Sequence, residues 1–269
     1  MELPQITDFR AEAAELHQIL APLVEADWRT ETQFKQWTIN DVVLHLHIAD
    51  KMALLSATDE AAYDALVADI QAQRARGMGW KDYGRYHLPD LTGPRLLACW
   101  REYLTNLCDV LAAKPVETRF KWSGPGMGLR MFATARQMET WAHGQTVYDV
   151  LGVERPPASP RLRNIAEIGV RTFAWAYRNR GVEVPAVAPF IRLETPFGEV
   201  WEWNESSEAD AVTGRALEFC QVVTQTRNVA DTDLRVSGET AQDWMRIAQC
   251  FAGGPETPPA PGTRYRAGV

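Results

Sequence analysis

Glu139 and His143 carry side chains that bind metal ions, and they lie four residues apart in the chain. The surrounding residues, about 130–150, have the spacing of a helix, and residues four apart on a helix share one face, with Cβ atoms about 5–6 Å apart. A carboxylate and an imidazole in this arrangement can bind one metal ion, or the carboxylate can orient the imidazole. A solvated pair on a surface helix is the plainer interpretation of the same spacing.

His45 is a third candidate ligand, on a different predicted helix. It shares a helical stripe with Val42, Ala49 and Met52, so its imidazole is expected to point into the interior. Facing helices of bundle proteins bring such side chains together at metal sites. A buried, neutral His45 with a polar partner is the alternative.

The neighbouring His47 cannot serve the same site as His45, because two residues correspond to a rotation of about 200° around a helix. Spacing alone does not choose between the two histidines, since Val43 and Leu54 form a second apolar stripe on the side of His47. Asp50 also lies on this second stripe. We expect it either to pair with His47 or to be solvated.

Amphipathic helices dominate the first half of the chain. Apolar residues recur at steps of three and four in four long segments, and a more polar helix is predicted between the second and the third of them. Thr38 and Asn40 are candidate N-caps of the second helix, and Pro94 suits the first turn of the third long helix. Four such helices, with one long connection between the second and the third, predict a four-helix bundle with a crossover. The predicted helices cover about residues 6–20, 38–52, 59–76, 94–111 and 130–150, and a Gly- and Pro-rich loop covers residues 120–129.

The second half of the chain has a different pattern. A Pro-rich stretch predicts a linker, and the residues after it alternate between helical spacing and short strands, with a turn at Pro196–Gly198 between two of the strands. This pattern predicts a mixed α/β domain followed by a loosely held tail from Gly253. The predicted helices are about 164–178, 215–226 and 240–251, and the predicted strands lie around 191–194, 201–203 and 234–236. The predicted organisation is a helical bundle over 1–153, a linker over 154–162 and an α/β domain over 163–269.

Composition and charge argue against several classes of protein. The 269 residues are 46% hydrophobic and 23% charged, with a net charge of −7, which is ordinary for globular proteins. The acidic balance and the lack of a basic run argue against a nucleic-acid partner. We expect no membrane span, no signal peptide and a cytoplasmic location, because no apolar run approaches about 20 residues and the N-terminus has no basic region. The four cysteines form no C-x-x-C pair and are expected to be reduced, buried thiols.

Two segments together resemble the DinB-like four-helix bundles, and in particular the mycothiol-dependent maleylpyruvate isomerase family. The segment WTINDVVLHL at residues 37–46 is similar to the family pattern W-(S/T)-x-x-(D/E)-V-x-x-H-L. The segment ARQMETWAHGQ at residues 135–145 resembles a metal-binding subgroup that reads A-R-x-M-E-T-W-A-H-G-Q. The resemblance extends to FCQVVTQTR at 219–227 and LRVSG at 234–238, in the C-terminal domain. It implies a DinB-like four-helix bundle with a smaller C-terminal mixed α/β domain.

The resemblance implies a divalent metal ion, usually zinc, bound by His45, Glu139 and His143, and it selects His45 over His47. Two imidazoles and one carboxylate are a common ligand set for zinc, and three protein ligands leave a position open for water or substrate. In the isomerase this position is implied to receive a low-molecular-weight thiol, which loses its proton on binding the metal.

The resemblance also implies the reaction. A thiolate can add to an electron-poor double bond, and rotation about the resulting single bond followed by elimination gives cis–trans isomerisation. Stopping after the addition, or displacing a leaving group, gives S-transfer. We therefore predict a metal- and thiol-dependent enzyme that acts on a small electrophilic, carboxylated substrate, as a monomer or homodimer. The alternatives are a hydrolase or lyase that activates water at the same site, and a metal-binding protein without turnover.

A functional arginine on a helix of the C-terminal domain is also implied by the resemblance. Its best match is Arg227, by its distance before the predicted strand at 234–236, although the residues read Gln225-Thr226-Arg227 where the family has G-R-R. An arginine there suits a substrate carboxylate through bidentate pairing, and a surface arginine is the alternative.

Several aromatic residues are candidates for the wall of a pocket. Trp122 and the loop 123–128 precede the helix of Glu139, and Tyr83, Tyr86 and His87 precede the third long helix. Binding residues favour loops on a rigid scaffold, but packing in the core explains these residues equally well.

Overall fold

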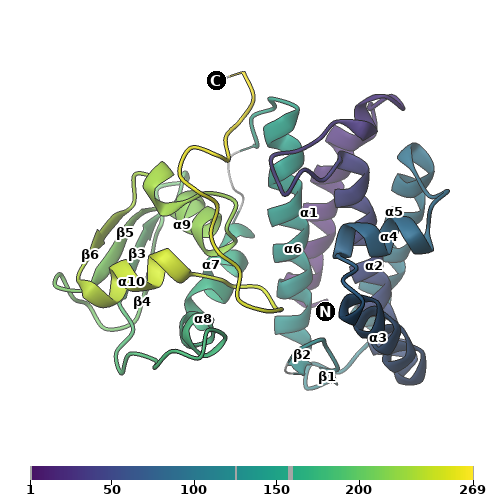
Figure 1. The fold of residues 1–269 in the computed structure, drawn as a ribbon. Helices are drawn as coiled ribbons and strands as arrows, with labels where there is room; N and C mark the ends of the chain where they lie inside the picture. Colours follow the sequence, from purple (N-terminus) through teal and green to yellow (C-terminus); the bar gives the residue numbers. More distant parts are fainter. Residues whose placement is uncertain (1, 125, 157–159, 269) are drawn as a thin grey trace. The chain divides into compact units, whose positions relative to one another are not determined.

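The computed structural model describes residues 2–124, 126–156 and 160–268. The chain divides into two compact units, residues 1–150 and 151–269. Figure 1 shows a helical first unit and a second unit that contains a four-stranded sheet, which confirms the predicted fold class. No helix of the described residues is both long enough and apolar enough to cross a membrane. The extent of the linker at 154–162 stays a prediction, and its residues 157–159 lie outside the described residues.

The first unit is built mainly of helices (Figure 1), and four of them correspond to the four long segments predicted for the bundle. Both α1 and α2 pack against α5 and α6, which confirms the predicted bundle. The stripe predicted for the first helix is buried along α1, from Ile6 through Phe9 to Leu20. The four helices are α1 (Pro4–Leu20), α2 (Ile39–Thr58), α5 (Gly93–Ala112) and α6 (Leu129–Val150).

Helix α2, which carries His45, starts at a well-defined cap. The Thr38 hydroxyl accepts a hydrogen bond from the Asp41 backbone at 3.2 Å, and the Asp41 carboxylate accepts one from the Thr38 backbone at 2.8 Å. Thr38 is therefore the N-cap, whereas the Asn40 side chain accepts a hydrogen bond from the backbone of Gly93 at the start of α5. The same Asp41 carboxylate accepts two hydrogen bonds of 2.6 Å from Arg85.

The crossover between α2 and α5 contains two helices, α3 (Glu60–Ala75) and α4 (Trp80–His87), and both pack against α2. The bond from Arg85 to Asp41 therefore holds α4 against the start of α2. The predicted loop 120–129, of which residue 125 lies outside the described residues, contains a short hairpin of β1 (Arg119–Phe120) and β2 (Met127–Gly128).

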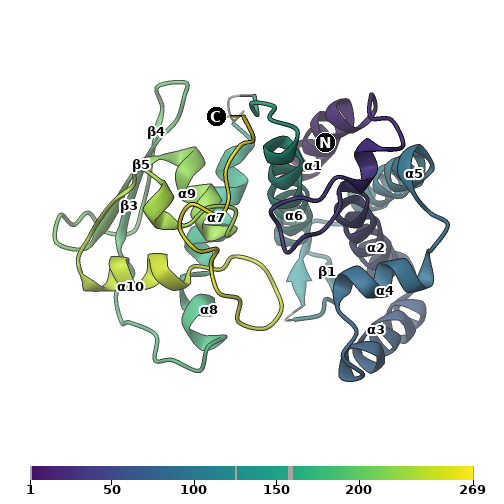
Figure 2. The same ribbon diagram turned by 45° about the horizontal axis from the view of Figure 1, so that its top comes forward.

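The second unit contains a mixed sheet in the order β4-β3-β5-β6. Strand β3 pairs antiparallel with β4 around the predicted turn and parallel with β5, and β5 pairs antiparallel with β6. Helices α7 and α9 pack together, and α9 contacts β3 and β5 (Figure 2). The elements are α7 (Leu162–Arg171), α8 (Phe173–Arg178), β3 (Phe190–Glu194), β4 (Val200–Trp203), β5 (Ala211–Arg215), α9 (Ala216–Val223), β6 (Arg235–Ser237) and α10 (Glu239–Ile247), with a 3-10 turn at Val229–Asp231.

The bounds of the helices predicted for this unit were wrong in detail, and one strand was missed. The helix predicted at 164–178 is interrupted at Thr172, where α7 ends and α8 begins, and the helices predicted at 215–226 and 240–251 end earlier, at Val223 and Ile247. Strand β5 was not predicted, because only two of its five residues are clearly apolar. The loosely held tail stays a prediction, although side chains of the unit form hydrogen bonds with its backbone. Examples are the Asn228 amide with Pro259 at 2.8 Å and the Asp231 carboxylate with Gly262 at 2.8 Å.

Candidate metal centre

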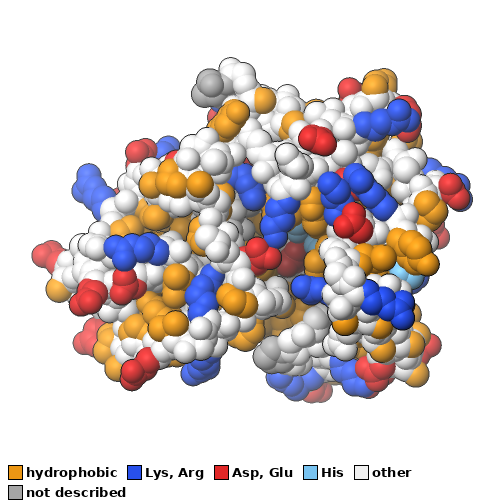
Figure 3. Space-filling view, in the orientation of Figure 1, with side chains coloured by type: hydrophobic (Ala, Val, Ile, Leu, Met, Phe, Trp, Pro, Cys, Tyr) orange, Lys and Arg blue, Asp and Glu red, His pale blue; other side chains and the backbone are white. Residues whose placement is uncertain are grey.

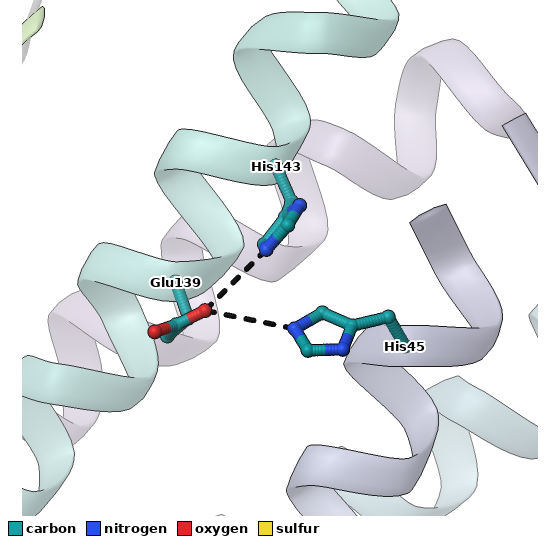
Figure 4. Close-up of side chains that lie close together, drawn as sticks. All are labelled: His45, Glu139 and His143. Carbon is teal, nitrogen blue, oxygen red and sulfur yellow. Dashed lines mark ion pairs between the residues drawn. The ribbon is translucent and has the colours of Figure 1, made fainter. Parts of the chain in front are cut away.

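Helices α2 and α6 bring His45, Glu139 and His143 together (Figure 4). One carboxylate oxygen of Glu139 lies 3.5 Å from Nε2 of His143 and 3.8 Å from Nε2 of His45. One potential ligand atom from each residue lies within 4.8 Å of the other two. The spacing of four residues on α6 puts Glu139 and His143 on one face, and the packing of α2 against α6 adds His45.

The three donors fit a divalent metal ion. Two imidazoles and a carboxylate are a common zinc ligand set, and donors around a tetrahedral zinc lie about 3.3 Å apart when each bond is about 2.0–2.1 Å. The observed distances of 3.5 and 3.8 Å are close to that value and at or beyond the limit of a good hydrogen bond. The side chains are 12–23% exposed, so the donors are shielded from bulk water without being sealed from it.

The protonation states of these side chains also suit metal binding. Burial lowers the pKa of His45 to about 4, and the neighbouring His143 adds to this shift. Burial by itself would raise the pKa of Glu139, but the two imidazoles and the Arg136 guanidinium outweigh it and hold that pKa well below its usual range. At neutral pH His45 is therefore neutral and Glu139 is ionised, and these are the forms that bind metal ions.

His47 lies in a different environment. Its ring packs edge-on against Tyr103 of α5, with ring centroids 5.0 Å apart, and it is 5% exposed. Burial, with a smaller effect from Lys51, lowers the pKa of His47 to about 4. The structure therefore groups His45, and not His47, with the two residues of α6.

Asp50 neither pairs with His47 nor is solvated, so both expectations for it were wrong. It is fully buried, and its carboxylate accepts hydrogen bonds of 2.9 Å from Arg136 of α6 and from the Trp100 indole of α5. Burial raises the pKa of Asp50, and Arg136 and Trp100 oppose that shift. Arg136 was not predicted as part of this region, although it lies three residues before Glu139, on a neighbouring part of the α6 surface.

The aromatic residues predicted as candidates for a pocket wall lie in different parts of the first unit. Trp122 packs edge-on against Phe132 at the start of α6, and the Arg136 guanidinium lies 5.8 Å from the Trp122 ring. Tyr83 is buried on α4 and donates a hydrogen bond of 2.8 Å to Asp69, which also lies 3.3 Å from His87. Tyr86 is 66% exposed. Of these residues only His87 could supply a metal ligand of the kind grouped here, and among the described residues it is not grouped with His45, Glu139 and His143.

Arg227 is in the second unit, but it is not on a helix as the resemblance implied. It follows the end of α9 by four residues, after Gln225, whose backbone φ of 57° ends the helical path. Its side chain is half-buried and donates a hydrogen bond of 2.8 Å to the carbonyl of Thr226.

On the face that Figure 3 shows, Lys and Arg side chains are interspersed with Asp and Glu side chains. This mixed distribution agrees with the overall net charge of −7.

Comparison with known proteins identifies the family of the chain. The profile of the mycothiol maleylpyruvate isomerase N-terminal domain matches residues 9–148, which include all three candidate ligands. Two uncharacterised proteins from two strains of Mycobacterium tuberculosis are each 40% identical over 252 residues, which is 94% of this chain and 96% of theirs.

Solved structures extend the similarity to the fold of most of the chain. The crystal structures of the mycothiol-dependent maleylpyruvate isomerase and of a mutant of it match with a TM-score of 0.53 and 13% sequence identity. The match covers 82% of this chain and 88% of the isomerase. At this identity the match shows a shared fold. Because the family profile spans more than half of the chain, the protein belongs to the mycothiol maleylpyruvate isomerase N-terminal domain family.

Proposed function

We propose that this protein is a metal-dependent enzyme that uses a low-molecular-weight thiol, such as mycothiol, for S-transfer or cis–trans isomerisation of a small, electrophilic, carboxylated substrate. The observation that carries the proposal is the convergence of His45, Glu139 and His143 from two helices. Family membership supports it, as does the fold shared with an isomerase whose name states its dependence on mycothiol.

In this proposal His45, Glu139 and His143 hold a divalent metal ion, with zinc the expected ion. Such an ion supplies the means to ionise a thiol near neutral pH. The three side chains supply three of the ligands that the ion needs, which leaves a position for the sulfur. Glu139 contributes a negative charge, and its low pKa keeps that charge in place at neutral pH.

Three of the chain's four cysteines are poor candidates for the reacting thiol, which supports a thiol from outside. The fourth, Cys99, is partly buried on α5, and among the described residues it is not grouped with the candidate metal ligands. Cys108, Cys220 and Cys250 are buried. Burial raises the pKa of Cys108 to about 12 and the pKa of Cys220 well above its ordinary value, so both are protonated at neutral pH. A thiol that must act as a thiolate is therefore better supplied by a small molecule.

Arg227 is the proposed partner of the substrate carboxylate. The resemblance of residues 219–227 to the family supports this role, and the planar guanidinium suits a carboxylate. We expect Arg227→Ala to raise KM for a carboxylated substrate more than it lowers kcat. Arg235→Ala removes an exposed arginine of β6 and is the matched control. Equal kinetics for the Arg227 and Arg235 variants would remove Arg227 from the proposal and leave the metal site unaffected.

Metal content tests the site directly. Wild type, His45→Ala and His47→Ala proteins are purified in parallel and their bound zinc is measured by mass spectrometry. We expect the wild type and His47→Ala to bind zinc and His45→Ala to lose it. His47→Ala is the matched control, because it removes another buried imidazole of α2, two residues after His45. Equal zinc in the wild type and His45→Ala would overturn the site.

Thiol dependence needs a separate experiment. The cobalt-substituted protein is titrated with mycothiol, bacillithiol and glutathione while the near-ultraviolet spectrum is recorded. We expect at least one thiol to produce a sulfur-to-cobalt charge-transfer band, and its binding to strengthen as the pH rises toward the pKa of the free thiol, because a proton is released. If no thiol produces the band, the thiol-dependent function is wrong and a water-activating hydrolase or lyase replaces it.

A further inference from the structure

Each histidine of the candidate metal centre lies between two aromatic rings. The His45 ring packs edge-on against Trp37 at 5.4 Å between centroids and against Trp80 at 5.5 Å. The His143 ring is stacked with Trp37 at 6.0 Å and packs edge-on against Phe34 at 5.2 Å. All four distances are within the range of about 4.5–7 Å that is favourable for aromatic pairs. Trp37 is the ring that both histidines share.

His45 lacks the contact that usually orients a metal-binding histidine. Such a histidine normally donates the hydrogen of its other ring nitrogen to a carboxylate, carbonyl or water, which sets the plane of the ring. The Nδ1 atom of His45 is buried and has no hydrogen-bond partner among the described residues. No hydrogen bond at Nδ1 therefore orients the His45 ring, and its ring plane depends on packing against Trp37 and Trp80 in addition to its contacts with Glu139 and His143.

The backbone holds Trp37 firmly in this position. Lys35 and Gln36 have φ values of 50° and 56°, a left-handed conformation that residues other than glycine, asparagine and aspartate rarely adopt. The turn is closed by a hydrogen bond of 2.9 Å from the Trp37 amide to the Phe34 carbonyl, and the Trp37 carbonyl accepts another of 2.7 Å from Thr32. Because this turn lies between Phe34 and Trp37, it directs both rings toward the histidines. Backbone strain of this kind is concentrated at functional sites.

We infer that Trp37 is a positioning residue of the metal centre and that, with Trp80 and Phe34, it orients the imidazoles of His45 and His143 by ring packing. The inference rests on the proposed metal site. Trp37 is 7% exposed and packs against both histidines. In the ring contacts between described residues, Trp80 packs against His45, and Phe34 packs against His143. Loss of Trp37 therefore frees two ligands, and loss of Trp80 frees one.

The test compares cobalt binding by the metal-free full-length protein and its variants. Affinity is measured by competition with a chromophoric chelator, and the visible d–d bands report the coordination geometry. We expect Trp37→Leu to weaken cobalt binding about tenfold or more, the size of effect known for residues that orient metal ligands, and to change the d–d bands. Trp37→Phe restores a ring and should recover most of the affinity. Trp80→Leu should give a smaller loss than Trp37→Leu.

Tyr103→Leu is the matched control, because it removes an equivalent edge-on ring from His47, which is outside the site. It should leave both the cobalt affinity and the d–d bands unchanged. A purely structural role of Trp37 would lower the melting temperature without changing the d–d bands of the folded protein. If Trp37→Leu does not fold, the cobalt affinity and the d–d bands of Trp80→Leu test the inference in its place.

The inference is overturned if the wild type binds cobalt and the folded leucine variants bind it with the same affinity and the same bands. That outcome leaves the proposed function in place. A wild type that binds cobalt no better than His45→Ala would instead overturn the metal site itself, and the inference with it.

Discussion

Arg136 and Asp50 form an ion pair inside the helical bundle, with Nε of Arg136 2.9 Å from a carboxylate oxygen of Asp50. Their side chains are 2% and 0% exposed. Arg136 belongs to α6, three residues before Glu139, and Asp50 belongs to α2, five residues after His45. The ion pair therefore joins the two helices that carry the candidate metal ligands, close to where they meet.

Breaking this ion pair should destabilise the protein strongly, because one charge is then left buried and uncompensated. We expect Asp50→Asn and Arg136→Met each to lower the free energy of unfolding by about 3–5 kcal/mol. The double variant should lose less than the sum of the two, since it buries no unpaired charge. Urea unfolding of the four proteins measures this coupling, and strictly additive losses would contradict it. Arg192→Ala, which breaks the exposed ion pair with Glu194, should cost no more than about 1 kcal/mol.

Removal of the metal should leave the bundle folded. The core of the first unit contains fully buried apolar side chains from all four long helices, such as Phe9, Leu46, Trp100 and Phe132. We therefore expect the helical circular dichroism at 25 °C to survive chelation. The free energy of unfolding should fall only by the amount that metal binding contributes, which is about 2.7 kcal/mol when the free metal concentration is 100 times its Kd. His45→Ala should show no response to the chelator, and a chelated wild type that loses its helical signal would show that the metal is needed for folding.

The metal-free protein should lose stability as the pH falls from 6.5 to 4. Burial lowers the pKa of His47 to about 4, against about 6.5 in the unfolded chain, so within this window the unfolded state binds the proton and the folded state does not. Protonation then favours unfolding, and stability rises with pH. The contribution of His47 is about 3 kcal/mol in total, of which about 2 kcal/mol is lost between pH 7 and pH 5.

The measurement is urea unfolding at pH 7 and pH 5 in the presence of a chelator. His47→Gln has no imidazole at this position, so its loss of stability between the two pH values should be about 2 kcal/mol smaller than that of the wild type. Equal losses in the two proteins would show that His47 does not titrate as its buried position predicts.

The cysteines should react very differently with alkylating reagents. Cys108 is fully buried and burial raises its pKa to about 12, whereas Cys99 is only partly buried. We expect a maleimide to modify only Cys99 in the native protein at pH 7.5, and all four cysteines in urea. Mass spectrometry of Cys99→Ser should then show no rapid modification. Rapid labelling of Cys108 in the native protein would contradict the environment described for it.

Local spacing in the sequence was sufficient to place part of the candidate site. Glu139 and His143 share a face because helical geometry relates residues four apart, whatever surrounds the helix. The same short-range rules predicted the buried stripe of α1 and an N-cap at Thr38 or Asn40, and the structure has the stripe and a cap at Thr38. Strands β3 and β4 were predictable for a similar reason, since a turn joins them and their residues alternate.

Only the tertiary structure decided which side of α2 faces α6. Both His45 and His47 lie on apolar stripes of one helix, and α2 is buried on several sides by α3, α4, α5 and α6, so its periodicity could not choose between them. The packing of α2 against α6 brings His45 to Glu139 and leaves His47 against Tyr103. The partner of Asp50 was hidden for the same reason, because Arg136 is 86 residues away in the chain. Strand β5 is defined by its pairing with β3 and β6 more than by its own residues. Contacts within a helical turn depend on nearby residues alone. The contacts of His45 with Glu139, of Asp50 with Arg136 and of β5 with its neighbouring strands depend on how distant elements pack together. No short stretch of sequence holds the information that determines this packing.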